Sequence, residues 1–273
     1  MRITIKLGGS ILENVDIRRR LLGEIADIAL RRHEIILVHG GGKSLNRRLA
    51  QLQMEARFID GLRVTDEATL GVAIMVLAGE VNKKLVVELG RPGVVALGLC
   101  GADAHAVHCV PVAGMPGYPE GIGFVGKPTK VNRDFFELLL GAGITPVVSS
   151  IAIGPDDAAA EAAQFYNINA DQMASACAAE TECEALLYLT DVPGVMDADE
   201  KVITSLSKDD ILELRARGAI SGGMLPKTTA CLEAIDAGVG AVYILPGVDG
   251  NILTNFIAGN LTKGTKIHGN HED

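Results

Sequence analysis

Two lysines and one aspartate stand in segments of this sequence that could together handle a phosphoryl group. Lys6 belongs to K6-L-G-G-S10, Asp171 ends N167-I-N-A-D171, and Lys227 belongs to G222-G-M-L-P-K-T-T229. Negative charge spreads over a phosphoryl group as it moves, so lysines and glycine N–H groups suit its stabilisation. Lys227 falls in the first turn of a predicted helix, where the dipole disfavours a cation, and this placement indicates a functional reason.

Each segment also has a purely structural interpretation. Both lysines could be solvated surface residues beside glycine-rich turns. Either Asn169 or Asp171 could cap the helix that follows, because both side chains accept hydrogen bonds from free N–H groups. If the three segments meet, Asp171 would instead orient two lysines that otherwise repel each other.

The loop L37-V-H-G-G-G-K-S44 has the ending of a P-loop but lacks its beginning. Leu37 stands where a P-loop has its first glycine, and Leu45 stands where a dinucleotide-binding fingerprint has its third. A strand that runs through three glycines into a helix still presents free N–H groups to an anion. The alternative is a tight turn that binds nothing.

Composition excludes several classes of protein. The 273 residues are 48% hydrophobic, and the net charge of −9 argues against general nucleic-acid binding. No signal peptide is visible, and the longest apolar stretch, residues 70–79, is too short to span a bilayer. Five cysteines without a C-x-x-C pair predict reduced thiols and a cytoplasmic protein, with no protein-held metal.

Strands and helices alternate along the chain. Apolar strands are predicted at residues 3–7, 34–38, 94–99, 144–149, 185–189 and 241–245, and short strands with turns are predicted at residues 104–126. Helices are predicted at residues 17–32, 44–53, 66–89, 135–140, 171–179, 208–217 and 223–237. This alternation predicts an α/β fold, a three-layer αβα sandwich with a mostly parallel central sheet whose strands point their carboxyl ends at the ligand.

The predicted helix at residues 66–89 is apolar on all sides. Leucine, isoleucine and valine form one stripe at helical spacing, and Val72, Met75 and Val76 add a second. Such a helix is buried on both sides, either in the core or between subunits. We favour the interface of a homodimer.

The motifs resemble those of the amino-acid kinase family, in family order and along nearly the whole chain. The matching pieces are K6-L-G-G-S10, H39-G-G-G42, G61-L-R-V-T-D66, N82-K, V147-V-S-S-I151, N167-I-N-A-D171, L189-T-D-V-P-G-V195 and G223-M-L-P-K227. Within the family, the combination of the third, sixth and eighth pieces is similar to members that phosphorylate N-acetyl-L-glutamate.

The resemblance implies a role for each matched residue. Lys6 and Lys227 would stabilise the transferred phosphoryl group, and Asp171 would organise both lysines. The γ-carboxylate of N-acetyl-L-glutamate would be the acceptor, and it needs no general base because it is already ionised. The residues implied to bind this substrate are Gly41, Gly42, Arg63 and Asn167.

The resemblance also implies ATP as the phosphoryl donor. The residues implied to contact its phosphates or its nucleotide are Gly8, Gly9, Thr190, Asp191 and Gly194. Mg²⁺ would be held mainly by the nucleotide's own oxygens. Lys43 would be incidental. Residues 1–170 would form an N-terminal lobe for substrate binding and dimerisation, and residues 171–273 a C-terminal nucleotide lobe, in one continuous fold.

One feature departs from the pattern of many family members. Many members carry a helix before the first strand that builds arginine-inhibited hexamers, whereas Lys6 here follows only five residues. We therefore expect a homodimer that arginine does not inhibit. The alternatives to an acetylglutamate-phosphorylating enzyme are a carrier-linked aminoadipate kinase of lysine synthesis and a non-catalytic nucleotide-binding regulator on the same fold.

Overall fold

The computed structural model describes residues 1–59, 61–118, 120–155, 164–197, 199–220 and 222–270. Its strands are β1 (Arg2–Leu7), β2 (Glu34–His39), β3 (Phe58–Ile59), β4 (Leu62–Arg63), β5 (Ala96–Leu99), β6 (Val107–Pro111), β7 (Val125–Val131), β8 (Thr145–Ser149), β9 (Ile151–Ile153), β10 (Phe165–Ile168), β11 (Ala185–Thr190), β12 (Ser205–Ser207), β13 (Ala241–Pro246) and β14 (Thr265–His268). Its α-helices are α1 (Gly9–Glu13), α2 (Val15–Leu30), α3 (Gly42–Gln51), α4 (Glu67–Ala73), α5 (Asn82–Gly90), α6 (Arg133–Gly141), α7 (Ala170–Glu180), α8 (Lys208–Ala216), α9 (Met224–Asp236) and α10 (Ile252–Ile257).

An eight-stranded sheet forms the middle of the molecule, in the order β12-β14-β13-β11-β1-β2-β8-β5. Its pairs are parallel except for β13 with β14. On one side of β1 the sheet continues through β2, β8 and β5, and on the other side it continues through β11 and β13. The carboxyl ends of β1 and β11 therefore meet where the strand order reverses, which is where open α/β sheets bind ligands.

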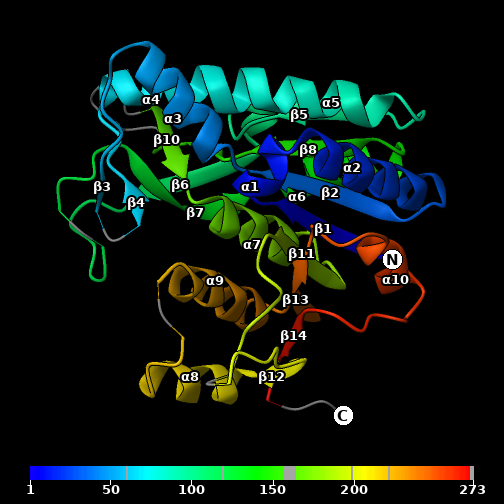
Figure 1. Ribbon diagram of the computed structural model, residues 1–273. Coiled ribbons are helices and arrows are strands. Elements are labelled where there is room, and N and C mark those ends of the chain that lie inside the picture. Colours follow the sequence, from blue (N-terminus) through cyan, green and yellow to red (C-terminus); the bar gives the residue numbers. More distant parts are fainter. Residues whose placement is uncertain (60, 119, 156–163, 198, 221, 271–273) are drawn as a thin grey trace.

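Two apolar cores cover the two faces of this sheet, so the predicted three-layer αβα sandwich is confirmed. One core contains buried residues of α6, α7, α8 and α9, and the other contains buried residues of α1, α2, α3, α4, α5 and α10. In Figure 1, α4 and α5 run along one side of the molecule, and α8, α9 and β12 lie at the opposite end. Within the described residues, no helix is long and apolar enough to cross a membrane.

Two smaller sheets flank the carboxyl ends of the main strands. Strands β6, β7, β9 and β10 close into a small barrel, and β3 pairs with β4 in a short hairpin. The sequence predicted only short strands with turns between residues 104 and 126, and it missed β9, β10, β12 and β14. These four strands have three or four residues each, so they carry little periodicity of their own.

The helix predicted at residues 66–89 is continuous, but its middle is not an α-helix. A π-helical segment, η1 (Ile74–Val81), joins α4 to α5. Asp66 caps the start, because its side chain accepts from the Thr69 N–H. Hydrophobic spacing cannot reveal the wider turn, since π-helical segments are rare and are set by what they pack against.

Candidate active site

The site is built around Asp171, near the start of α7. Asn169 caps this helix, and its Oδ1 accepts from the N–H groups of Asp171 at 2.8 Å and Gln172 at 3.4 Å. Of the two capping candidates, the structure therefore selects Asn169. The Asp171 carboxylate is left free for other partners.

Both predicted lysines reach the Asp171 carboxylate, one on each oxygen. The Lys6 Nζ lies 2.7 Å from Oδ1, and the Lys227 Nζ lies 2.9 Å from Oδ2. Lys6 comes from the carboxyl end of β1 and Lys227 from the first turn of α9. The sheet and two helices thus bring together three residues that are far apart in the sequence.

Burial makes this cluster electrostatically strong. Desolvation alone would raise the pKa of Asp171, but attraction to Lys6 and Lys227 outweighs it and lowers that pKa to about 2. Desolvation lowers the pKa of Lys6, and attraction to Asp171 opposes this effect. Two cations on one anion leave an excess positive charge in a site of low dielectric, and such a site attracts an anion such as a phosphoryl group.

The glycine loop after β2 lines a pocket of about 180 Å³. Gly40, Gly41 and Gly42 form one wall, and Arg63 and Asn167 are also part of the lining. Gly42 is the first residue of α3, so its N–H is among those that a helix leaves free at its start. The pocket therefore combines helix N–H donors, a guanidinium and an amide.

Arg63 is buried beside this pocket and is only partly used by the protein. Its Nη2 donates to Asn46 Oδ1 at 2.5 Å, and its guanidinium lies 4.6 Å from the centre of the Phe58 ring. Its Nη1 is buried and has no hydrogen-bond partner among the described residues. Burial lowers the pKa of Arg63, and a carboxylate in the pocket would supply the missing acceptor.

The other wall of the pocket holds Asn167. This residue lies on β10, and its Nδ2 donates to Thr65 Oγ1 at 3.3 Å. Ala170, one residue before Asp171, also lines the pocket. The pocket therefore adjoins the helix that carries the charged cluster.

The predicted nucleotide residues gather at the ends of β1 and β11, with one exception. The Gly8 N–H donates to the Leu189 carbonyl at 3.0 Å, which holds the Gly8-Gly9 turn against Thr190. A hydrogen bond from Ser10 is the main cause that lowers the pKa of Asp191, and the charge of Lys43 adds to it. Attraction to Asp191 also acts on the Lys6 ammonium, so these groups share one electrostatic environment.

The exception, Gly194, packs inside the C-terminal part of the fold. A Cβ atom built on Gly194 would lie 2.7 Å from Thr265 Oγ1, and its φ of 150° also favours glycine. Packing therefore accounts for this glycine without a ligand.

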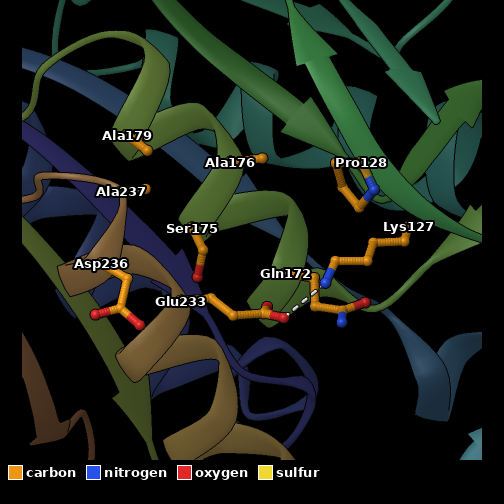
Figure 2. A pocket seen from close by; sticks show the side chains of 9 residues that line it. All are labelled: Lys127, Pro128, Gln172, Ser175, Ala176, Ala179, Glu233, Asp236 and Ala237. Atoms are coloured by element: carbon orange, nitrogen blue, oxygen red, sulfur yellow. Dashed lines mark hydrogen bonds and ion pairs between the residues drawn. The ribbon is translucent and has the colours of Figure 1, made fainter. Parts of the chain in front are cut away.

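A second cavity lies on the α7–α9 seam but contains none of the predicted site residues. Figure 2 shows this cavity of about 390 Å³ between β7, α7 and α9, with Lys127 and Glu233 joined across its mouth. Alanines and Pro128 form much of its lining. The charges that suit phosphoryl transfer lie elsewhere.

The sequence missed three residues that touch the site. Tyr188 lies under Lys227, with its ring centre 5.3 Å from Nζ, and its hydroxyl donates to the Asp171 carbonyl at 3.1 Å. Nothing in the sequence marks this buried strand residue. Asn46 lies one helical turn after Gly42, and Ser10 ends the K6-L-G-G-S10 motif, so spacing and motif could have identified these two.

No group of three or more histidine, cysteine, aspartate or glutamate side chains in the described ranges could hold a metal ion. This finding concerns the protein's own ligands alone.

Comparisons with known proteins agree with this geometry. Residues 1–246 match the model of a family described as the amino acid kinase family. The chain is 43% identical over 267 residues to the acetylglutamate kinase of Koribacter versatilis, covering 98% of both chains, and 42% identical to that of Acidobacterium capsulatum, covering 98% of this chain and 99% of the other. The crystal structure of a Streptococcus mutans UA159 protein superposes with a TM-score of 0.77 at 26% identity, covering 98% of both chains.

Proposed function

The chain belongs to the amino acid kinase family, and we propose that it transfers the γ-phosphoryl group of ATP to the γ-carboxylate of N-acetyl-L-glutamate. The product would be an acyl phosphate, at a step of arginine biosynthesis. The observation that carries the proposal is the buried Asp171 carboxylate with a lysine on each oxygen. This arrangement concentrates positive charge where a phosphoryl group needs it, and the curated relatives are named for this activity.

Charge stabilisation and positioning would perform the reaction. The acceptor carboxylate attacks the γ-phosphorus as an ionised group, so no side chain has to remove a proton. Lys6 and Lys227 would stabilise the charge on the phosphoryl oxygens from two sides. Asp171 would keep the two ammonium groups close together before the substrates arrive, so little reorganisation accompanies the reaction.

The pocket of about 180 Å³ would hold the acceptor. Arg63 has a free buried donor for the α-carboxylate, and the Asn167 amide would bind the same substrate. The N–H groups of Gly41 and Gly42 would hold the γ-carboxylate. A small acidic substrate thus finds several hydrogen-bond donors around one short pocket.

ATP would lie across the ends of β1 and β11. Gly8 and Gly9 would approach the phosphates, and Thr190 and Asp191 would face the nucleotide, while Gly194 would only hold the segment that follows them in place. Mg²⁺ bound to ATP would neutralise part of the phosphate charge, and the phosphate oxygens would hold it. In this arrangement residues 1–170 bind the acyl substrate and residues 171–273 bind most of the nucleotide.

The proposed homodimer rests on apolar side chains that the single chain leaves exposed. Met75 of η1 and Val87 of α5 are 61% and 60% exposed, and Val95 and Leu97 beside or on the edge strand β5 are 63% and 40% exposed. A second copy could cover this face. ATP dependence and reduced cysteines suit the cytoplasm, which completes the proposal.

ATP-dependent hydroxamate formation with hydroxylamine tests the function. The purified protein is given N-acetyl-L-glutamate, L-glutamate, L-aspartate or N-acetyl-aminoadipate, each with and without Mg²⁺. We expect a signal with N-acetyl-L-glutamate and Mg²⁺. No observation favours the carrier-linked aminoadipate kinase or the regulator, and silence on all four acceptors with ATP still bound would reopen both.

A further inference from the structure

His39 and Asn82 belong to motifs of the sequence but have no role in the proposed reaction. Both side chains are fully buried, His39 at the carboxyl end of β2 and Asn82 at the start of α5. A buried polar pair in an apolar core costs stability unless its hydrogen bonds are made. Its presence directly behind the glycine loop therefore calls for an explanation.

The hydrogen bonds fix the protonation of this pair. Asn82 Nδ2 lies 3.0 Å from His39 Nε2 and 2.8 Å from the Val147 carbonyl oxygen. An amide nitrogen can only donate, so His39 Nε2 must be the acceptor. Burial lowers the pKa of His39 to about 4, so the ring is neutral and its proton is on Nδ1.

The Nδ1–H group of His39 fixes the orientation of the peptide bond between Gly40 and Gly41, the first of the glycine loop. Nδ1–H donates to the Gly40 carbonyl oxygen at 2.8 Å. In a trans peptide the C=O and the next N–H point in opposite directions, so the Gly41 N–H points away from the His39 ring. No acceptor in the described part of the chain takes this N–H, which leaves it for a ligand in the pocket that Gly41 lines.

Asn82 links the His39 side chain, and through it the Gly40–Gly41 peptide, to the π-helical segment η1. Its backbone N–H donates to the Leu77 carbonyl, a bond across five residues that stacks Asn82 above Leu77. Leu77 in turn covers Gly41, because a Cβ atom built on Gly41 would lie 2.7 Å from Leu77 Cδ2. Gly41 is thus held from two sides, by Leu77 and through Gly40 by the His39–Asn82 pair.

We propose that His39 and Asn82 are positioning residues, and that their bridge from η1 to Gly40 aims the Gly41 N–H at the acceptor carboxylate. This inference rests on the proposed function, because it assigns that N–H to the acceptor. It explains why a rare π-helical turn lies against the loop. It also separates the two substrates, since the bridge touches the acceptor pocket and none of the residues assigned to ATP.

Calorimetric titration of the full-length protein with N-acetyl-L-glutamate and with a non-hydrolysable ATP analogue tests the inference. Asn82→Leu keeps the approximate volume and removes the hydrogen bonds that Nδ2 donates to His39 Nε2 and to the Leu99 and Val147 carbonyls. His39→Phe keeps a ring and removes both nitrogens. We expect each variant to raise the Kd for N-acetyl-L-glutamate by about tenfold, the effect of one misaimed hydrogen bond to a charged group. The Kd for the ATP analogue should change by less than about twofold.

Thr4→Val is the matched control, because it removes a buried hydrogen bond, to Cys183 at 3.1 Å, from the same sheet away from the loop. We expect it to lower the melting temperature and to leave both Kd values unchanged. A folded His39 or Asn82 variant with an unchanged Kd for N-acetyl-L-glutamate, or with equal losses for both ligands, would overturn the positioning role alone. Wild-type protein that does not bind N-acetyl-L-glutamate would overturn the proposed function, and this inference with it.

Discussion

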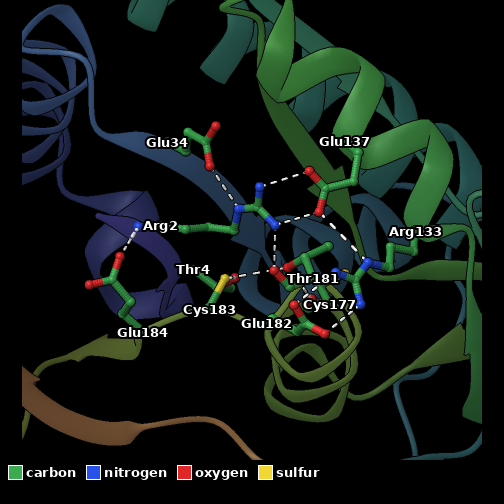
Figure 3. A network of polar contacts seen from close by, with 10 residues as sticks. All are labelled: Arg2, Thr4, Glu34, Arg133, Glu137, Cys177, Thr181, Glu182, Cys183 and Glu184. Atoms are coloured by element: carbon green, nitrogen blue, oxygen red, sulfur yellow. Dashed lines mark hydrogen bonds and ion pairs between the residues drawn. The ribbon is translucent and has the colours of Figure 1, made fainter.

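Strand β1 carries a cation near each end, and the balance of charge around these two cations differs. Arg2 lies at the amino end, in a network with Glu34 and Glu137 that Figure 3 shows from close by. Lys6 lies at the carboxyl end, on the Asp171 carboxylate. The first network satisfies its cations, and the second leaves an excess positive charge.

Each arginine of the Arg2 network is paired with glutamate side chains. The guanidinium donates to Glu34 at 2.8 Å, to Glu137 at 2.6 Å and to the Thr181 carbonyl at 2.6 Å. Arg133 pairs with Glu182 at 2.6 Å next to it. Two arginines face three glutamates, so the network has no surplus cation for an anionic ligand, and its side chains are partly open to solvent.

The Lys6 cluster is arranged in the opposite way. The side chains of Lys6, Asp171 and Lys227 are only 10%, 13% and 13% exposed, and the cations outnumber the anion. Such a cluster is costly to bury and gives little stability. The comparison therefore indicates that the Arg2 network stabilises the fold and that the Lys6 cluster serves the reaction.

Removing either lysine of the second cluster should give the largest effect. We expect Lys6→Ala and Lys227→Ala each to lower kcat by about 10²–10³-fold, because each removes a contact to charge in the transition state. Arg2→Ala, the matched removal at the other end of β1, should leave kcat within about twofold. Steady-state hydroxamate assays measure all three, and near-normal kcat in both lysine variants would rule out the mechanism.

A variant of Arg63 should distinguish a residue that binds the acceptor from the lysines that stabilise the transition state. Arg63→Ala removes the buried donor from the acceptor pocket, and we expect the KM for N-acetyl-L-glutamate to rise by about 10–100-fold. The KM for ATP should stay nearly constant. Unchanged kinetics in this variant would contradict the assignment of the pocket, even if the lysine variants behave as expected.

The low pKa of Asp171 gives the cluster a characteristic pH dependence. The carboxylate is favoured in the folded protein, so its contribution is fully present above the unfolded value of 3.8 and is lost as pH falls toward 2. We expect the difference in unfolding free energy between wild type and Asp171→Asn to shift by about 2 kcal/mol over that window. Urea titrations at several pH values measure it, and a difference that is independent of pH would show that the lysines do not hold the carboxylate.

The Arg2 network should show the smallest effect, and salt should reduce it. Arg2→Met should lower the free energy of unfolding by about 1–2 kcal/mol, because the partly exposed partners lose their charge-assisted hydrogen bonds. Raising the salt to about 1 M should shrink this difference through screening. Urea titrations at low and high salt, compared with Arg31→Met of the exposed Arg31–Asp27 pair, would reveal an equal effect if the network were unimportant.

Much of the fold and the family could be predicted from local patterns and motifs in the sequence. The alternation of apolar runs and amphipathic helices follows from local periodicity, and the αβα sandwich follows from that alternation. The candidate lysines, Asp171 and the glycine loops were identifiable from their places beside strand ends and helix starts, whereas Arg63 was identified through the resemblance to the family. Of the fold, the π-helical segment η1 and several short strands were not predicted, since each depends on contacts made in the folded chain or has too few residues to show a period.

The contacts between these parts could not be predicted from the sequence and are known from the folded structure. Two side chains could cap α7, and the position of the lysines selected Asn169 and freed Asp171. Contact with Gly41 accompanies the π-helical turn at Leu77, and a hydrogen bond between the end of β2 and the start of α5 joins His39 to Asn82. These outcomes depend on distances between segments far apart in the chain, and the periodicity of a single segment carries no information about such distances.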